Sequence, residues 1–144
     1  MLVVDASVAA KWFFSEADSH SALELFRTDF KLVGPGIIRL EVASAFARRA
    51  RDDQITAEDA LDNRDRWLSA IATNAIRLED QSIDLAVGLE LALRLKHLLP
   101  DCVYLAMAMR YEAPLVTADE KFARKASKEY EKVLGIEEAL ALSA

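Results

Sequence analysis

The chain has 144 residues, enough to bury about 68–70% of the unfolded surface in a single domain, and we expect one domain over residues 1–144. Lys and Arg number 18 against 24 Asp and Glu, so the net charge of −6 argues against a protein that holds nucleic acid by its overall charge. It leaves room for a local basic rim around an acidic pocket. A hydrophobic content of 53% with 29% charged residues excludes a disordered chain.

Cysteine usage and hydropathy indicate the compartment. Cys102 is the single cysteine, so no intrachain disulfide can form and a reducing compartment, the cytoplasm, is expected. The longest stretch without a charged residue, 67–76, is far shorter than the roughly 18–20 apolar residues that a membrane span needs. We therefore expect no signal peptide and no membrane contact.

The first half of the chain predicts two short strands, each followed by helices. Leu2 to Val4 is a β-branched apolar run that predicts a buried parallel strand, and it ends at Asp5. The expected elements are a strand over 2–4, a helix from residue 7, a helix over 17–30, a strand over 31–33 closed by a turn at 34–36, and a helix over 37–52. The residues expected on the buried faces of the two long helices are Leu23, Phe26 and Phe30, and then Leu40, Ala43, Phe46 and Ala47.

The second half continues the alternation. Thr56 and Asp59 form a helix-start signature. The elements expected after it are a helix to about 73, a strand over 75–78, a helix over 83–96 with Ala86, Leu89, Leu93 and His97 at steps of three or four, a helix opened by Pro100-Asp101 and running to 111, a strand over 115–117, a helix over 121–130, a strand over 132–134 and a closing helix from 136. This alternation predicts an α/β fold, a three-layer α/β/α sandwich with a short, mainly parallel central sheet.

Several common catalytic sites are excluded. The four glycines, at 34, 36, 88 and 135, are not clustered, so there is neither a dinucleotide-binding fingerprint nor a phosphate-binding P-loop. No G-x-S-x-G motif is present. His20 and His97 lie in helical contexts without metal-ligand spacing, and the expected role of His97 is that of a half-exposed surface histidine.

Four carboxylates stand where a shared site can form. Asp5 and Asp119 follow strands, Asp101 heads a helix, and Glu41 lies on the helix after the second strand's turn. Ligands of open α/β sheets bind outside the carboxyl ends of the strands, so these acids are expected to meet there. Two carboxylates about 4–5 Å apart repel by roughly 3–4 kcal/mol at an effective dielectric constant of about 20. Protons or divalent cations must offset this repulsion, and oxygen-only ligation suits Mg²⁺ or Mn²⁺ and phosphodiester hydrolysis.

Each acid also has a purely structural interpretation. The three aspartates are good N-cap residues for the helices that follow them. Glu41 can form a solvated pair with Arg39. A cap and a metal ligand are compatible roles, so both interpretations stay open from spacing alone.

Four segments in register carry a family resemblance. They are Leu2-Val-Val-Asp5-Ala-Ser7-Val, Arg39-Leu-Glu41-Val-Ala-Ser-Ala, Pro100-Asp101-Cys-Val-Tyr104-Leu-Ala-Met-Ala and Leu115-Val-Thr117-Ala-Asp119. From residue 2 to about 125 the chain resembles the PIN domain, and more narrowly the small VapC-type toxins of bacterial and archaeal toxin–antitoxin pairs. The resemblance implies a divalent-metal-dependent ribonuclease site at Asp5, Glu41, Asp101 and Asp119. It also implies that Thr117, and Ser7 in the same way, supports the metal site.

The resemblance further implies a homodimer and an antitoxin that holds the enzyme inactive. The antitoxin's C-terminal segment would lie in a groove and place an Arg among the acids. Helices 17–30 and 37–52 offer such a groove, and ordinary core packing is the alternative for their bulky residues, Trp12, Phe13, Phe14, Leu25 and Phe46. The basic residues expected near RNA phosphates are Lys11, Arg48, Arg49 and Arg51, although a solvated face paired with Asp52 and Asp53 explains the arginines equally well.

The expected function is therefore a magnesium- or manganese-dependent endoribonuclease, the toxin of a type II toxin–antitoxin system. We expect Asp5, Glu41 and Asp101 to hold one metal, with Asp119 and Thr117 orienting the attacking water or completing a second site. One alternative is a catalytically silent PIN-like module that binds RNA or protein. Another is a hydrolase with an Asp nucleophile, which is disfavoured because Ser7 stands where that class has a second acid.

Overall fold

The computed structural model describes residues 1–143, so residue 144 of the expected domain lies outside the described part. Five strands form one sheet in the order β3-β2-β1-β4-β5, and every neighbouring pair is parallel. The strands are β1 (Leu2–Val4), β2 (Leu32–Pro35), β3 (Arg77–Glu79), β4 (Leu115–Val116) and β5 (Val133–Leu134).

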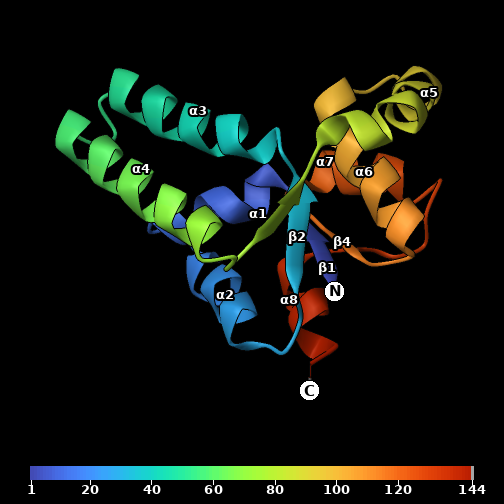
Figure 1. The fold of residues 1–144 in the computed structure, drawn as a ribbon, viewed down its shortest axis with the longest axis horizontal. Coiled ribbons are helices and arrows are strands. Elements are labelled where there is room, and N and C mark those ends of the chain that lie inside the picture. The colour runs from blue at the N-terminus through green and yellow to red at the C-terminus, as the bar shows by residue number, and fades with distance from the viewer. Residues whose placement is uncertain (144) are drawn as a thin grey trace.

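Helices cover the sheet on both sides, which confirms the three-layer prediction. Figure 1 shows α1, α3 and α4 on one side and α5, α6 and α7 on the other. The helices are α1 (Ala6–Ala10), α2 (Ser19–Glu24), α3 (Ile38–Arg51), α4 (Ala57–Ala72), α5 (Leu85–Leu95), α6 (Leu99–Tyr111), α7 (Glu120–Ala126) and α8 (Ile136–Ala141). Three 3-10 segments join them, namely η1 (Lys11–Phe13), η2 (Leu25–Arg27) and η3 (Gln81–Asp84). Within residues 1–143, no helix has both the length and the apolar character of a membrane span.

Local sequence explains where several elements begin. The predicted helix start at Thr56 is a capping box, since Thr56 and Asp59 exchange side-chain and backbone hydrogen bonds at the start of α4. α6 is buried along its whole middle, from Cys102 to Ala108, because it packs against the sheet and under α5. Strands β1 and β4 are fully buried for the same reason, as their continuous apolar runs predict.

Some predicted boundaries are wrong. The turn expected at 34–36 does follow the strand but lies at 36–37, because β2 continues through Pro35. The amide of Gly36 donates to the carbonyl of Glu79 at 2.6 Å. The helix expected over 17–30 is shorter, with α2 ending at Glu24 and η2 following. α7 ends at Ala126 rather than near Tyr130.

The helix faces predicted to be buried are largely wrong. On α3, Leu40 is 69% exposed, and the residues that face the core are Ile38, Val42, Ala45 and Phe46. On α5, Leu93 is 72% exposed while Gly88, Leu91 and Ala92 pack inward. Leu23 and Phe26 are also exposed, and Ala22 and Leu25 are buried in their place. α3 and α5 each carry two apolar stripes at helical spacing, so periodicity alone does not say which stripe packs inward.

The aromatic residues considered for an antitoxin groove form part of the core instead. Phe13 packs edge-to-face on Phe46 and on Trp67, with ring centroids 5.0 and 6.0 Å apart. Phe14 lies 5.8 Å from Phe46, and Trp12 lies 4.3 Å from Phe26. Four of the five expected groove residues are buried and the fifth, Phe13, is half-buried, so ordinary core packing accounts for them.

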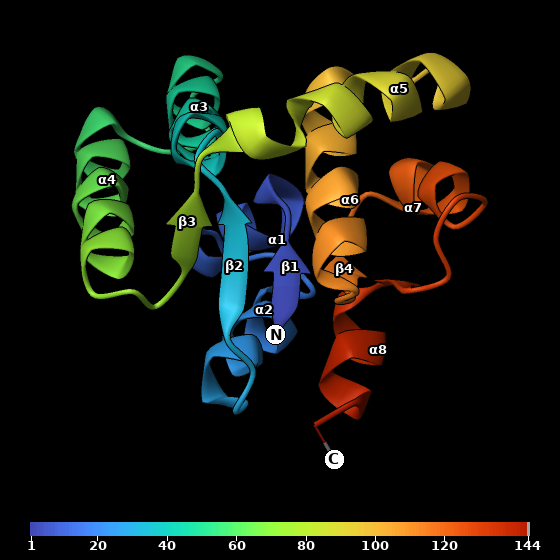
Figure 2. The same cartoon turned by 45° about the vertical axis from the view of Figure 1, so that its right-hand side comes forward.

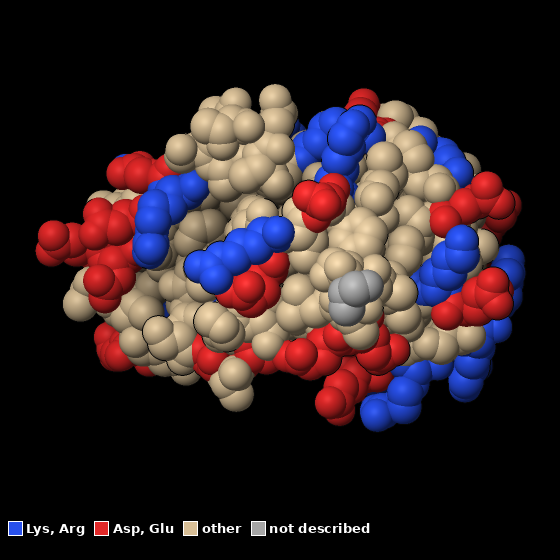
Figure 3. All heavy atoms as spheres, turned by 90° about the horizontal axis from the view of Figure 1, so that it is seen from below, with Lys and Arg blue, Asp and Glu red and all other residues tan. Residues whose placement is uncertain are grey.

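The strands all run in one direction, so their carboxyl ends form one edge. In Figure 2 this edge lies at the top, beside the start of α3 and below the line of α5. The opposite end carries α2, α8 and the described end of the chain. Figure 3, seen from that lower end, shows acidic and basic side chains interspersed rather than a single-sign patch. A site for a charged ligand is therefore expected at the other edge.

Candidate active site

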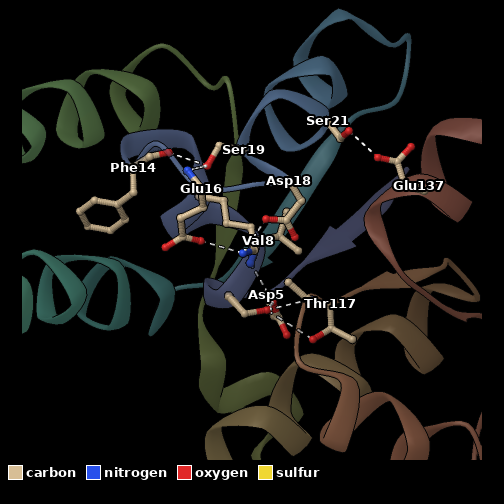
Figure 4. A network of polar contacts seen from close by, with 12 residues as sticks. Asp5, Val8, Phe14, Glu16, Asp18, Ser19, Ser21, Thr117 and Glu137 are labelled. Carbon is tan, nitrogen blue, oxygen red and sulfur yellow. Dashed lines mark hydrogen bonds and ion pairs between the residues drawn. The ribbon is translucent and has the colours of Figure 1, made fainter.

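Asp5 and Thr117 meet at the carboxyl edge because β1 and β4 are paired in parallel. Val4 stands opposite Val116 in the register, so the next residues of both strands leave the sheet side by side. The amide of Asp5 donates to the carbonyl of Val116 at 3.2 Å. Figure 4 shows the Asp5 and Thr117 side chains pointing toward each other. Sheet register thus places two residues that are far apart in the chain at one point.

Asp5 is a buried carboxylate, only 4% exposed. It accepts hydrogen bonds from the Ser7 hydroxyl at 2.5 Å and from the Val8 amide at 3.2 Å, so it is also the N-cap of α1. Burial raises the pKa of the Asp5 carboxyl to about 6, against the opposing effect of the bonds from Ser7, Thr117 and Val8. The cap and the site interpretations of Asp5 therefore hold together.

Ser7 joins the two strand ends. Its Oγ accepts from the Ala118 amide at 2.9 Å and lies 3.4 Å from the Thr117 hydroxyl. Thr117 in turn accepts from the amide of Asp119 at 3.1 Å. Asp119 is exposed and caps α7 by accepting from the Phe122 amide at 3.0 Å. These short-range bonds fix the loop that carries Asp119 to the loop that carries Asp5.

Glu41 reaches the same edge from α3 and is held by α6. The buried hydroxyl of Tyr104 donates to Glu41 Oε1 at 2.7 Å. Burial, and after it the charge of Asp101, raises the pKa of Glu41, while the bond from Tyr104 lowers it. None of the ion pairs of residues 1–143 includes Glu41, so the predicted alternative of a solvated pair with Arg39 is wrong.

Asp101 is a first-turn residue of α6 and not its cap, which is Leu98. Its Oδ2 lies 2.6 Å from His97 Nε2. Burial raises the pKa of Asp101, the bond and charge of His97 lower it, and the charge of Asp119 raises it. The cap interpretation of Asp101 is therefore wrong, and its neighbours are other ionisable groups.

His97 is not the surface helix residue that the sequence suggests. α5 ends at Leu95, and Lys96 takes a left-handed conformation with φ of 50°, which turns the chain back toward the sheet. The imidazole is 9% exposed and stacks on the Phe122 ring with centroids 4.9 Å apart. Packing thus holds His97 against Asp101.

The four acids form one electrostatic group centred on Asp101. Its charge raises the pKa of both Asp5 and Glu41, and the charge of Asp119 raises the pKa of Asp101. Within residues 1–143, no three Asp, Glu, His or Cys side chains lie close enough to hold an ion as they stand. Glu41 is hydrogen-bonded to Tyr104, and Asp101 contacts His97. The oxygen donors of these carboxylates and hydroxyls nevertheless suit Mg²⁺ or Mn²⁺. The charge of a bound cation would stabilise the ionised carboxylates and so lower their raised pKa values.

Two residues beyond the predicted set belong to this group, Tyr104 and His97. Tyr104 had a signal in the sequence, because it follows Asp101 by three residues and so shares its helix face. His97 precedes Asp101 by four residues, but the helix break between them hides the relation. Spacing therefore points to Tyr104, whereas only the turn at Lys96 explains His97.

Comparisons with known proteins agree with this geometry. The model of the PIN domain family matches residues 2–128. No curated protein matches the sequence. A toxin–antitoxin complex from Klebsiella pneumoniae has a chain with a TM-score of 0.66 and 19% identity, over 94% of this chain and 98% of that one.

Two further solved structures share the fold. PAE2754 from Pyrobaculum aerophilum matches with a TM-score of 0.70 and 19% identity, over 97% of this chain and 93% of that one. VapC20 from Mycobacterium tuberculosis, described as a toxin that cleaves the sarcin-ricin loop, matches with a TM-score of 0.68 and 16% identity, over 86% of this chain and 94% of that one. On the family match, which covers nearly the whole chain, this protein belongs to the PIN domain family.

Proposed function

We propose that this chain is a divalent-metal-dependent endoribonuclease that acts as the toxin of a type II toxin–antitoxin pair. The observation that carries the proposal is the group of four acids at the carboxyl edge of the sheet, coupled through Asp101. Family membership and the toxins among the similar structures support the same function. Carboxylate oxygens are the ligands that Mg²⁺ and Mn²⁺ prefer, and hydrolysis of a phosphodiester is the chemistry that such a cation serves.

Asp5, Glu41 and Asp101 are the residues that would hold the metal, Mg²⁺ or Mn²⁺. When bound, the ion supplies Lewis-acid polarisation of the phosphodiester. Ser7 fixes the Asp5 carboxylate and Tyr104 fixes that of Glu41. His97 orients Asp101 from outside, as residues behind a metal ligand commonly do.

Asp119 and Thr117 would position the water molecule that attacks the phosphodiester. Asp119 is exposed at the start of α7, and Thr117 accepts its amide proton while facing Asp5. This position suits a carboxylate that orients the attacking water or completes a second, weaker metal site. The loop bonds from Ser7 and Thr117 keep that carboxylate at a fixed place relative to Asp5.

The proposed partners are an RNA substrate, a cognate antitoxin and a second copy of the chain. An antitoxin Arg placed among the four acids would relieve the same repulsion that a metal relieves. Apolar side chains exposed near the start of α3 and α5, among them Leu40, Ile83 and Val87, support a homodimer. The cytoplasm is the proposed compartment. Sedimentation of wild type against Leu40→Glu and Val87→Glu tests the dimer, which should dissociate in both variants.

The decisive experiment is cleavage of a structured RNA by purified protein with Mg²⁺, with Mn²⁺ and with EDTA. Asp101→Asn should abolish cleavage, whereas Asp65→Asn, an exposed acid of α4 paired with Arg64, should leave it unchanged. Cutting that persists in Asp101→Asn would show a contaminating nuclease or a wrong site. No cutting, together with no metal binding by calorimetry, would favour the silent binding module. Turnover of a phosphate monoester in place of RNA would favour the hydrolase with an Asp nucleophile.

A further inference from the structure

A surface pocket of about 540 Å³ adjoins the acid group on the side of α5 and α7. Three lysines line it, Lys96 after α5, and Lys121 and Lys125 on α7. Figure 2 shows the end of α5 passing above α7, which brings these lysines together from two elements. We propose that this lysine pocket binds the phosphate of the RNA strand next to the one that is cleaved, an inference that rests on the proposed ribonuclease function.

His97 connects the lysine pocket to the acid group. Its Nε2 faces Asp101 at 2.6 Å, and its Nδ1 lies 3.4 Å from the ammonium group of Lys125. The imidazole ring of His97 therefore stands between the carboxylate of Asp101 and the ammonium group of Lys125 and contacts both. Neighbouring phosphates of a single RNA strand lie close together, so a strand with one phosphate at the acids has the next phosphate nearby. The lysine pocket is the basic surface that this next phosphate would contact.

The charge of the pocket is free to act on a ligand. Among the described residues, none of Lys96, Lys121 and Lys125 forms an ion pair with a carboxylate. The ammonium group of Lys125 instead donates to the carbonyl of Lys96 at 3.1 Å, which holds it at the pocket. In a chain of net charge −6, these lysines form a local basic rim beside an acidic centre.

Two of the basic residues expected from the sequence, Lys11 and Arg49, are less suited to this role. Lys11 is already bound between Glu16 and Asp18, at 2.8 Å from each. Arg49 is paired with Glu16 and lies over the Phe14 ring at 3.9 Å. Binding RNA phosphates would require these side chains to give up carboxylate partners, whereas the lysine pocket loses none.

The pocket also offers apolar surface, which favours a nucleic-acid strand over a simple anion. Leu98 is 70% exposed and Leu93 is 72% exposed, and both line it. Proteins that bind single strands combine a basic groove for the backbone with apolar or aromatic surface for the sugars and bases. The combination of three lysines and two leucines therefore fits a nucleotide of an unpaired RNA segment.

The test measures RNA binding without cleavage, by fluorescence anisotropy of a labelled single-stranded RNA in EDTA over a series of salt concentrations. Each lost phosphate contact should lower the salt slope by about 0.7, which is about fivefold in affinity at 0.1 M salt. The variants are Lys121→Ala, Lys125→Ala and Lys96→Asn, since Asn tolerates the left-handed conformation of residue 96. Lys128→Ala, an exposed lysine just beyond α7, is the matched control.

The outcomes separate this proposal from the proposed function. Reduced affinity and slope in the pocket variants, with Lys128→Ala unchanged, would support the pocket even if wild type cleaves no RNA. Unchanged binding in all three variants of an enzyme that cleaves RNA would overturn the pocket and leave the ribonuclease function intact. Poly-glutamate bound as tightly as RNA, with the same lysine dependence, would assign the pocket to an acidic protein segment and also overturn the proposal.

Discussion

Replacing Asp5 by Asn should stabilise the metal-free protein at neutral pH. Burial raises the pKa of this carboxyl from 3.8 to about 6, and each unit corresponds to about 1.4 kcal/mol. The ionised carboxylate therefore costs roughly 3 kcal/mol above pH 6 relative to its neutral form. Asn has no charge to bury, and its Oδ1 can still accept from Ser7 and Val8. We expect Asp5→Asn to gain about 1–3 kcal/mol at pH 7.5 in EDTA.

The pH dependence of this gain has a definite sign. Because the folded pKa is raised, the folded protein binds more protons than the unfolded chain between pH 3.8 and about 6. The wild type therefore loses stability from this group as the pH rises through that window. The advantage of Asp5→Asn should appear across the same window and stay constant above it. Urea denaturation at several pH values, with circular dichroism as the signal, measures the difference.

Metal and a matched cap variant complete the test. A saturating divalent ion should stabilise the wild type, by about 2.7 kcal/mol at one hundred times its Kd, and should not stabilise Asp5→Asn. Asp119→Asn changes an exposed helix cap in the same way and should show no gain at neutral pH. An Asp5→Asn variant that is folded but no more stable than wild type at pH 7.5 in EDTA would refute the reasoning.

Three further predictions concern stability. Gly88→Ala should destabilise the protein by about 1–3 kcal/mol in urea titrations, because a Cβ there would lie 3.0 Å from a Val103 methyl and 3.3 Å from its Cα. The control Gly34→Ala should be tolerated, because its Cβ would meet no atom nearer than 3.5 Å. Tyr104→Phe should lower the free energy of unfolding by about 1–2 kcal/mol and reduce RNA cleavage, because Glu41 loses its hydrogen-bond donor. A variant as stable as wild type in urea would show that water replaces the hydroxyl. Glu16→Gln should lower the free energy of unfolding at pH 7, because the bond from Lys11 lowers the pKa of Glu16. The difference should shrink as the pH falls below the ordinary 4.5 and vanish below the lowered pKa of the folded state, and a difference that persists in strong acid would contradict this.

The sequence predicts the sheet and the site acids for a physical reason. A strand buried on both faces is a continuous apolar run, so Leu2–Val4 and Leu115–Val116 are recognisable without any tertiary information. Acids that follow such runs must emerge at the carboxyl edge, which predicts the meeting of Asp5 with the loop of Thr117 and Asp119. The capping box at Thr56 is equally local, and the structure confirms it.

The helix faces could not be predicted in the same way. α3 and α5 each have two apolar stripes, and the stripe that packs inward depends on the direction in which the helix crosses the sheet. Leu40 and Leu93 therefore lie exposed although their spacing is that of core residues. Only one of the two stripes can face the core, so the packing of the helix against its neighbours decides which stripe is buried.

The sequence by itself determined the parallel α/β fold and the emergence of Asp5 and Asp119 at its carboxyl edge, because both follow from the direction of the strands and the residues at their ends. Tertiary structure decided how these acids are supported. The left-handed turn at Lys96 brings His97 against Asp101. The sheet between α3 and α6 sets the distance at which Tyr104 of α6 meets Glu41 of α3 at the carboxyl edge. Neither contact follows from local periodicity, because each joins elements whose relative position is set by the packing of the whole domain.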